Sequence, residues 1–263
     1  MADWRHRRDR RSRTSPRLSH ESTIDRMESA AGQTTPQHAG NGSSALLSRE
    51  PTQTEITETE ITDKRLVRGA KTRRTVLRRA VDVASIEGLN GVSFGRLATD
   101  TGLSKAGVQT LFRTKETLQL AAIEYAREMF IAAVIQPARS APRGAARLRA
   151  LLEHWIVYAE APLFAGGCFR AANLAECDSR PGPVRDALFR DQQEWIGVIA
   201  GELRHAVNAG EIAGLDIDLT AFQIDAVLCA ANTALRVGDP DAVNKVRRIV
   251  GGLLSSSAMT PPD

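Results

Sequence analysis

The sequence is poor in the residues that mark several common classes of protein. Among 263 residues there are three cysteines, Cys168, Cys177 and Cys229, whose number and spacing fit neither a disulfide framework nor a zinc motif. We therefore expect reduced thiols in a cytoplasmic protein. No run of about 18 apolar residues occurs, which argues against a membrane partner. The arginine-rich N-terminus is followed by no apolar stretch, so we expect no secretory signal.

Catalytic and metal-binding signatures are also scarce. Glu202 and His205 are three residues apart and would share a helix face, but two ligands are too few for a metal site. Cys168 has no visible base beside it, and a buried thiol is inert. The sequence therefore predicts no catalytic residues, no metal and no cofactor, and the chain is not expected to be an enzyme.

No long segment alternates polar and apolar residues with period two, so no sheet is expected. Apolar residues instead recur at i, i+3 and i+4, which predicts an all-α protein. The expected helices cover about 65–87, or 71–87, then 115–135, 145–161, 168–176, 184–208, 217–237 and a segment after Asp239, besides two short helices between residues 93 and 112.

The stretch from Ser93 to Leu118 contains those two short helices and the start of a third. Ser93 and Ser104 are suitable N-caps, because a serine hydroxyl accepts from the free N–H groups of a first turn. Gly102 stands where the chain must adopt a left-handed conformation after the first short helix. Val108, Leu111 and Phe112 form one buried face of the second. A helix, a tight turn with glycine and a second helix describe a helix-turn-helix unit.

In such a unit the second helix enters the DNA major groove. Its small residues near the start let the backbone approach the bases, Lys105 can neutralise a phosphate, and Gln109 can bond a base edge or a phosphate. Lys115, at the next helix start, suits an anion. The alternative is a helical hairpin that contacts only protein. The outward residues that we expect at the DNA are Ser104, Lys105, Ala106, Gly107, Gln109 and Thr110, with Arg113 beside them.

The basic residues gather in the same part of the chain. Residues 64–135 contain thirteen basic and six acidic residues, whereas residues 136–263 contain thirteen basic and fifteen acidic residues. Counterion release from phosphates requires a basic excess of this kind on the DNA-binding part. Arg73 fits either DNA proximity or an ordinary solvated face. Residues 1–64 are poor in large apolar residues and are expected to be disordered.

From about Lys71 to Phe130 the sequence resembles the DNA-binding domain of the tetracycline-repressor (TetR) family of bacterial transcriptional regulators. The resemblance lies in TRRTVLRRAVDVASIEG, GLNGVSFGRLATDTGLSKAGV and LFRTKETL, which follow in the family's order and spacing. It implies phosphate contacts from Thr72, Ser93, Lys105 and Lys115, and we add Phe94 to this surface. The chain departs from the family at Gln109, where an aromatic residue is usual.

The resemblance also implies a C-terminal domain for dimerisation and ligand binding. The final helices, from about Leu219 to Leu254, would form a four-helix bundle with their copies in a homodimer; the alternative is that they complete a monomer core. The remaining helices would enclose an effector pocket, although each residue also suits a packed core. The pocket candidates are Trp155, Tyr158, Phe164, Cys168, Phe169, Asn173 and Trp195.

The sequence thus predicts a disordered extension over 1–64, a DNA-binding domain over 65–130 with its helix-turn-helix at about 93–112, a regulatory domain over 131–257 and a disordered tail over 258–263. The expected protein is a homodimeric repressor that a small apolar effector releases from a palindromic double-stranded operator. One alternative is an effector-independent or redox-responsive regulator that uses Cys168 or Cys177. A less favoured one is a helical enzyme or interaction module without DNA.

Overall fold

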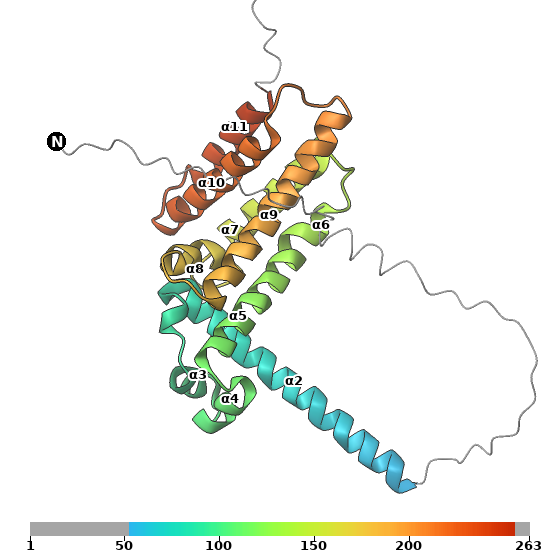
Figure 1. The fold of residues 1–263 in the computed structure, drawn as a ribbon, viewed down its shortest axis with the longest axis vertical. Helices are drawn as coiled ribbons and strands as arrows, with labels where there is room; N and C mark the ends of the chain where they lie inside the picture. The colour runs from blue at the N-terminus through green and yellow to red at the C-terminus, as the bar shows by residue number, and fades with distance from the viewer. Residues whose placement is uncertain (1–52, 256–263) are drawn as a thin grey trace, which may run out of the picture. The chain divides into compact units, whose positions relative to one another are not determined.

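The structure, a computed structural model, describes residues 53–255 (Figure 1). Every regular element in this range is helical, as the sequence predicted. The predicted tail over 258–263 and most of the extension over 1–64 lie outside the described residues. The helices are α2 (Gln53–Glu87), η1 (Leu89–Gly91), α3 (Phe94–Thr101), α4 (Lys105–Phe112), α5 (Lys115–Phe130), η2 (Ile131–Ile135), α6 (Gln136–Ala138), α7 (Ala145–Glu160), α8 (Phe169–Cys177), α9 (Pro183–Asn208), α10 (Ile217–Arg236) and α11 (Ala242–Ser255).

Helix α2 is longer than predicted and begins at Gln53, within the segment that we expected to be disordered. Its end at Glu87 agrees with the prediction. The C-terminal half carries an apolar stripe that includes the fully buried Val76, Ala80 and Val81. This stripe packs on α3, α5 and α8. The helix therefore contacts both the helix-turn-helix region and the C-terminal helices.

Helices α3 and α4 form the predicted helix-turn-helix. The Ser93 hydroxyl accepts from the Arg96 amide at 3.2 Å, and the Ser104 hydroxyl accepts from the Gly107 amide at 3.0 Å. Gly102 adopts φ 69° and ψ 20°, a left-handed conformation that residues with a Cβ avoid. Local hydrogen bonds thus fix where each short helix starts and how the chain turns between them.

Helix α5 runs from this region into the C-terminal half, between α2 and α9 (Figure 1). The Thr114 hydroxyl caps its N-terminus by accepting from the Thr117 amide at 3.1 Å. The helical path continues past Phe130 through a π-helical turn, η2, into the short helix α6, which contains Pro137. One nearly continuous helical rod therefore joins the two regions.

The C-terminal helices α7 to α11 pack around α9, which contacts α5, α7, α8 and α10. Two carboxylates hold the start of α7: Glu202 accepts from the Gly144 amide at 2.8 Å, and Glu211 accepts from the Ala145 amide at 2.7 Å. Negative charge at a helix N-terminus is favourable because the helix dipole is positive there. All these contacts belong to one compact unit, and the domain boundary at residues 130/131 stays a prediction.

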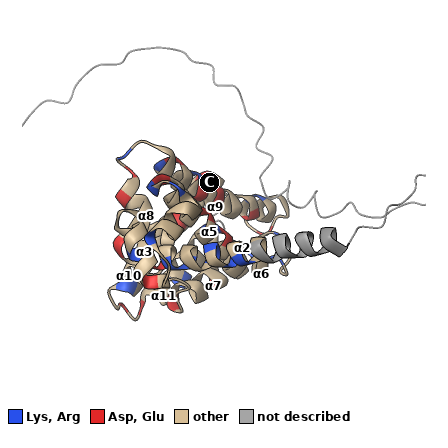
Figure 2. Ribbon diagram, turned by 90° about the horizontal axis from the view of Figure 1, so that it is seen from below, with Lys and Arg blue, Asp and Glu red and all other residues tan. Residues whose placement is uncertain are grey.

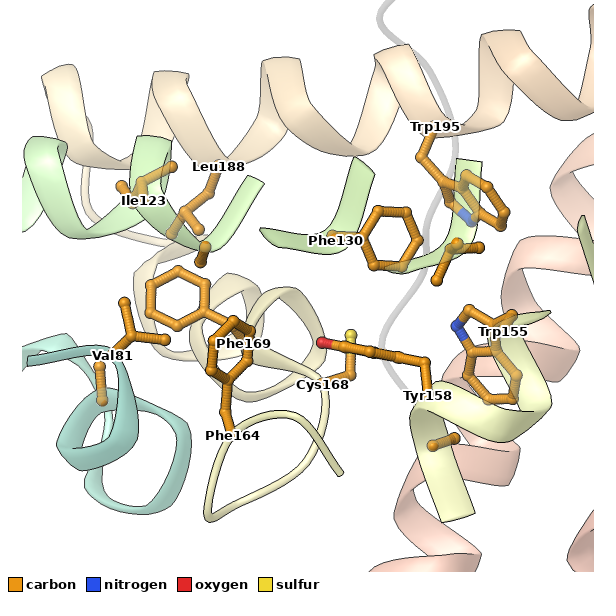
Figure 3. Packing of buried hydrophobic residues seen from close by; sticks show 14 of the residues in the cluster. Val81, Ile123, Phe130, Trp155, Tyr158, Phe164, Cys168, Phe169, Leu188 and Trp195 are labelled. Atoms are coloured by element: carbon orange, nitrogen blue, oxygen red, sulfur yellow. The ribbon is translucent and has the colours of Figure 1, made fainter. Parts of the chain in front are cut away.

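Aromatic side chains fill the centre of the C-terminal half (Figure 3). Phe130 meets the rings of Tyr158 and Trp195 edge to face, with centroids 5.3 and 5.1 Å apart. Phe164 meets Tyr158 and Phe169 in the same way at 6.4 Å. Edge-to-face packing places the positive edge of one ring on the negative face of the next. This cluster connects α5, α7, α8 and α9 and explains their arrangement.

Candidate nucleic-acid interface

Helix α4 presents one face to solvent and the other to the protein. Val108 and Phe112 are buried at 0 % and 1 % exposure and hold the helix on the core. The residues that the sequence placed at the DNA are all exposed on the other face, namely Ser104, Lys105, Ala106, Gly107, Gln109 and Thr110. The first exposed turn has small side chains, so that the backbone is open to close approach.

A hollow of about 310 Å³ lies beside the start of α4. The N-termini of α3, α4 and α5 meet there, and each brings unpaired backbone N–H groups and the positive end of a helix dipole. Lys105 and Lys115 both reach the hollow. The Lys115 ammonium also donates to the Asn90 carbonyl oxygen at 2.8 Å, which fixes its position. The lining residues are Ser93, Phe94, Gly95, Lys105, Lys115 and Leu118.

The hollow therefore brings together four of the predicted DNA-contact residues, Ser93, Phe94, Lys105 and Lys115. Two ammonium groups and three helix N-termini around one concave surface make a suitable receptor for a phosphate oxygen. The sequence indicated these residues by their caps and charge. Their convergence on one hollow required the three-dimensional arrangement.

Thr72 and Arg73 lie outside the hollow, on α2. The Thr72 hydroxyl donates to the Arg68 carbonyl oxygen of its own helix at 2.9 Å. The Arg73 guanidinium stacks over the Phe112 ring, with its central carbon 4.8 Å from the ring centroid. Arg73 therefore supports α4 from behind by a cation–π contact. Its predicted contact with DNA remains a prediction. Figure 2 shows further Lys and Arg residues along the described part of α2.

Ion pairs hold α3 in place beneath this surface. Arg79 of α2 binds Asp100 of α3 at 2.7 Å, and Arg96 of α3 binds Glu87 at the end of α2. The pKa of Glu87 lies below its usual value, chiefly because Arg96 donates a hydrogen bond to it. These arginines are paired with acids, whereas Lys105 and Lys115 form no ion pair within residues 53–255.

Comparisons with known proteins find similarity in the C-terminal part of the chain and in its fold. Residues 144–250 match the family of tetracyclin repressor-like C-terminal domains. A TetR transcriptional regulator from Chloroflexus aurantiacus J-10-FL is 25 % identical, with 72 % of this chain and 94 % of that chain covered and a TM-score of 0.61. The chain is thus similar to the TetR family of transcriptional regulators in its C-terminal part and in its fold.

Two further solved structures resemble this chain. SCO4454, a TetR-family regulator from Streptomyces coelicolor, is 20 % identical, with 72 % of this chain and 90 % of that chain covered and a TM-score of 0.62. AibR, solved in complex with isovaleryl coenzyme A and operator DNA, is 19 % identical, with 70 % and 97 % covered and a TM-score of 0.58. No curated relative matches the chain.

Two structural findings concern residues 53–255. No helix in that range has the length and apolar character needed to cross a membrane. The same residues contain no group of three or more His, Cys, Asp or Glu side chains arranged to hold a metal ion.

The seven residues predicted to line the effector pocket of the TetR fold are brought together in the C-terminal core. All are buried, with exposures of 0 % to 6 %, and five of them are aromatic: Trp155, Tyr158, Phe164, Phe169 and Trp195. The Tyr158 ring extends to the Cys168 side chain (Figure 3), and the Asn173 amide donates to the Phe169 carbonyl oxygen at 2.8 Å. These side chains pack against one another, as they would in an ordinary protein core. Their role in binding an effector therefore stays a prediction.

The sequence analysis missed a buried ionic cluster beside these aromatics. The Arg170 guanidinium binds Asp191 at 2.7 Å and lies 4.9 Å from the centroid of the Phe130 ring. Burial opposes the charge of Arg170, but the nearby Asp191 outweighs it, so that the pKa of Arg170 is raised. Asp225 accepts from the Gln192 amide at 3.1 Å, and burial raises the pKa of its carboxyl. Arginine side chains are normally exposed to solvent. The position of Arg170 in the helical repeat of α8 was therefore the only feature of the sequence that could have indicated its burial.

At two of the three cysteines of this chain, the surroundings disfavour the thiolate. Cys168 and Cys177 are buried. Burial raises the pKa of Cys177, and it raises the pKa of Cys229 to about 12. A thiol reacts as its thiolate, so Cys177 and Cys229 are poor nucleophiles near neutral pH.

Proposed function

We propose that this protein is a homodimeric repressor that binds a palindromic operator through α4 and releases it when a small apolar effector binds. The observation that best supports this proposal is the exposed face of α4, which lies beside the hollow lined by Lys105 and Lys115. In this proposal Lys105 and Lys115 bind phosphates, and Gln109 and Thr110 meet base edges in the major groove. Residues 65–130 act as the DNA-binding domain and 131–257 as the regulatory domain.

An exposed apolar stripe on α10 and its C-cap residue, Val237, supports the homodimer. Leu219, Phe222 and Val237 are 53 %, 62 % and 79 % exposed, which is unusual for large apolar side chains. The small exposed residues Ala226 and Ala230 lie between them on the same helix. Spacings of three, four and seven residues place these side chains along one side, where a second copy of α10 packs closely.

A two-fold dimer gives the DNA-binding mode its geometry. Recognition helices related by a two-fold axis meet successive major grooves about 34 Å apart, which is one turn of B-DNA. A palindromic operator repeats the same half-site in both grooves. A single copy of α4, with its short contact surface, binds DNA weakly, so dimerisation supplies affinity as well as symmetry.

The aromatic core is the proposed effector site. The AibR structure shows that a protein of this fold holds both a coenzyme A thioester and operator DNA. In the present chain the cluster around Tyr158 offers mostly apolar surface with a few polar groups, which suits a small apolar compound. The effector must open this packed cluster, and it shifts the dimer toward a state whose two α4 helices no longer match the operator.

The experiment is a gel shift with the purified full-length chain and the DNA upstream of its own gene. We expect retardation that weakens steeply as salt rises, because phosphate contacts release counterions. Absence of any retarded band at low salt, against upstream DNA and against random duplex, contradicts the proposal. A panel of small apolar compounds added to the complex then tests release, and release by oxidant alone would favour the thiol-based alternative.

A further inference from the structure

The loop between α7 and α8, residues 161–168, lies against the C-terminal half of α2. The Arg78 guanidinium of α2 donates to the Leu163 carbonyl oxygen at 2.5 Å. The same guanidinium lies 5.5 Å from the centroid of the Phe164 ring, and Phe164 is fully buried. The first half of the loop is thus attached to α2 by one charged hydrogen bond and one cation–π contact.

The second half of the loop is attached one and two turns further along α2. The Ala165 amide donates to an Asp82 carboxylate oxygen at 3.3 Å, and the Gly166 amide donates to the Ser85 hydroxyl at 2.8 Å. Ser85 in turn donates to the Asp82 carbonyl oxygen at 2.8 Å and is only 4 % exposed. Positions 78, 82 and 85 share one face of the helix, so the loop follows a single stripe of α2.

Gly166 makes this close contact possible. A Cβ atom at this position would lie 2.0 Å from the Ser85 carbonyl oxygen and 2.7 Å from the Ile86 amide nitrogen. Both atoms are backbone atoms, so any larger residue would push the loop off α2. The loop backbone and the α2 backbone are therefore in direct contact, without an intervening side chain.

The other end of the loop is attached to α10. The Cys168 amide donates to the Asn232 side-chain oxygen at 3.1 Å, in a buried hydrogen bond. Gly167 lies against Asn232 and Arg236. A chain of bonded contacts consequently runs from Asn232 of α10 through six loop residues to Ser85, Asp82 and Arg78 of α2.

We propose that this loop is a clamp that makes α10 and the DNA-reading region move together. The covalent route between them runs along α5, and the clamp is a second, non-covalent route that reaches α2 through Arg78, Asp82 and Ser85. Because α2 supports α4 through Arg73 and Phe112, a displacement of α10 reaches the recognition helix through the clamp. Two experiments test the clamp. The one that measures operator binding rests on the proposed function, whereas the one that measures amide hydrogen exchange does not.

The first test is amide hydrogen exchange on the full-length chain and its Asn232→Ala variant. Loss of the bond to Cys168 should speed exchange in residues 78–88 of α2, although Asn232 is on a different helix. Thr233→Ala is the matched control, because that neighbouring side chain is exposed and bonds only the Cys229 carbonyl oxygen of its own helix. Asn232→Asp keeps the acceptor and should restore the wild-type exchange. Wild-type exchange in α2 of a folded Asn232→Ala protein overturns the proposal.

The second test is a double-mutant cycle between Ser85→Ala and Asn232→Ala, read by operator affinity. Each variant should weaken binding about three- to tenfold, the range expected for one lost buried hydrogen bond. Because both break the same chain of contacts, the double variant should be little weaker than the worse single one. Thr75→Ala, whose hydroxyl bonds within α2, is the control on that helix. If the two losses of operator affinity multiply in the double variant, or if neither single variant changes the affinity, the clamp is refuted.

The two tests also separate failure of the clamp from failure of the proposed function. If the wild-type chain binds no DNA while Asn232→Ala still speeds exchange in α2, the clamp stands and the DNA-binding proposal falls. If Asn232→Ala does not fold, hydrogen exchange is measured in α10 of the Ser85→Ala variant instead. We expect faster exchange in α10, and unchanged exchange there would refute the clamp.

Discussion

Lys105→Ala tests the phosphate contact at the start of α4. Lys105 is exposed, lines the hollow beside Lys115, and has no ion-pair partner within residues 53–255. Its removal should therefore change the free energy of unfolding by less than about 0.5 kcal/mol, as for most surface substitutions. Any effect on DNA binding then reports the contact with DNA.

The magnitude follows from counterion release. One phosphate contact contributes about 0.9 to the slope of log K against log salt, so two copies in a dimer contribute about 1.8. When the salt concentration rises roughly fourfold, the DNA affinity of the wild type should thus fall by a factor about twelve times larger than the affinity of the variant does. The loss of affinity should be similar on all DNA sequences, because phosphate contacts are not sequence-specific.

The assay is fluorescence anisotropy with a labelled operator duplex at several salt concentrations. Lys245→Ala is the matched control, since it removes the same charge from α11, where Lys245 binds Asp239 at 2.7 Å. The control should leave the slope unchanged. A wild-type slope for Lys105→Ala, or an equal change in the control, would refute the phosphate contact.

Three further predictions concern the cap, the dimer and a buried acid. Ser104→Ala should lower the free energy of unfolding by about 1 kcal/mol in urea titration, whereas Ser104→Asp keeps the cap and loses DNA binding by charge repulsion; equal stability of both variants would count against the cap. Phe222→Asp should convert the dimer to monomers in sedimentation, and Val157→Asp should not; a dimeric Phe222→Asp protein contradicts the α10 interface. The pKa of Asp225 is raised by burial, so its stabilising effect is complete below the unfolded pKa and is lost as pH rises through the folded value. The wild type should accordingly lose stability relative to Asp225→Asn as pH rises from about 4, and parallel pH profiles would argue against it.

Local features of the fold could be predicted because local chemistry determines them. Ser93 and Ser104 were identified as caps from side-chain type and position, and each accepts the expected backbone hydrogen bond. Gly102 was identified from the need for a left-handed residue, and it has that conformation. The exposed and buried faces of α4 followed from helical periodicity.

Contacts between distant segments could not be predicted from the sequence. Nothing near Arg73 indicates that it stacks on Phe112, and nothing near Gly166 indicates that it lies on the Ser85 backbone. Arg170 is a charged residue in a buried site, against its ordinary preference for solvent. The early start of α2 at Gln53 was missed because its polar residues provide no apolar periodicity. These features depend on tertiary packing, which single-sequence patterns do not encode.

The most direct test of the central claim, that α4 enters the major groove twice per dimer, is methylation interference at guanine N7 on the operator duplex. That atom faces the major groove, so its methylation blocks a helix lying there. The account predicts two clusters of interfering guanines, related by two-fold symmetry and about one helical turn apart, with the pattern altered in Gln109→Ala. A single cluster, or binding that is insensitive to methylation throughout the operator, would contradict it.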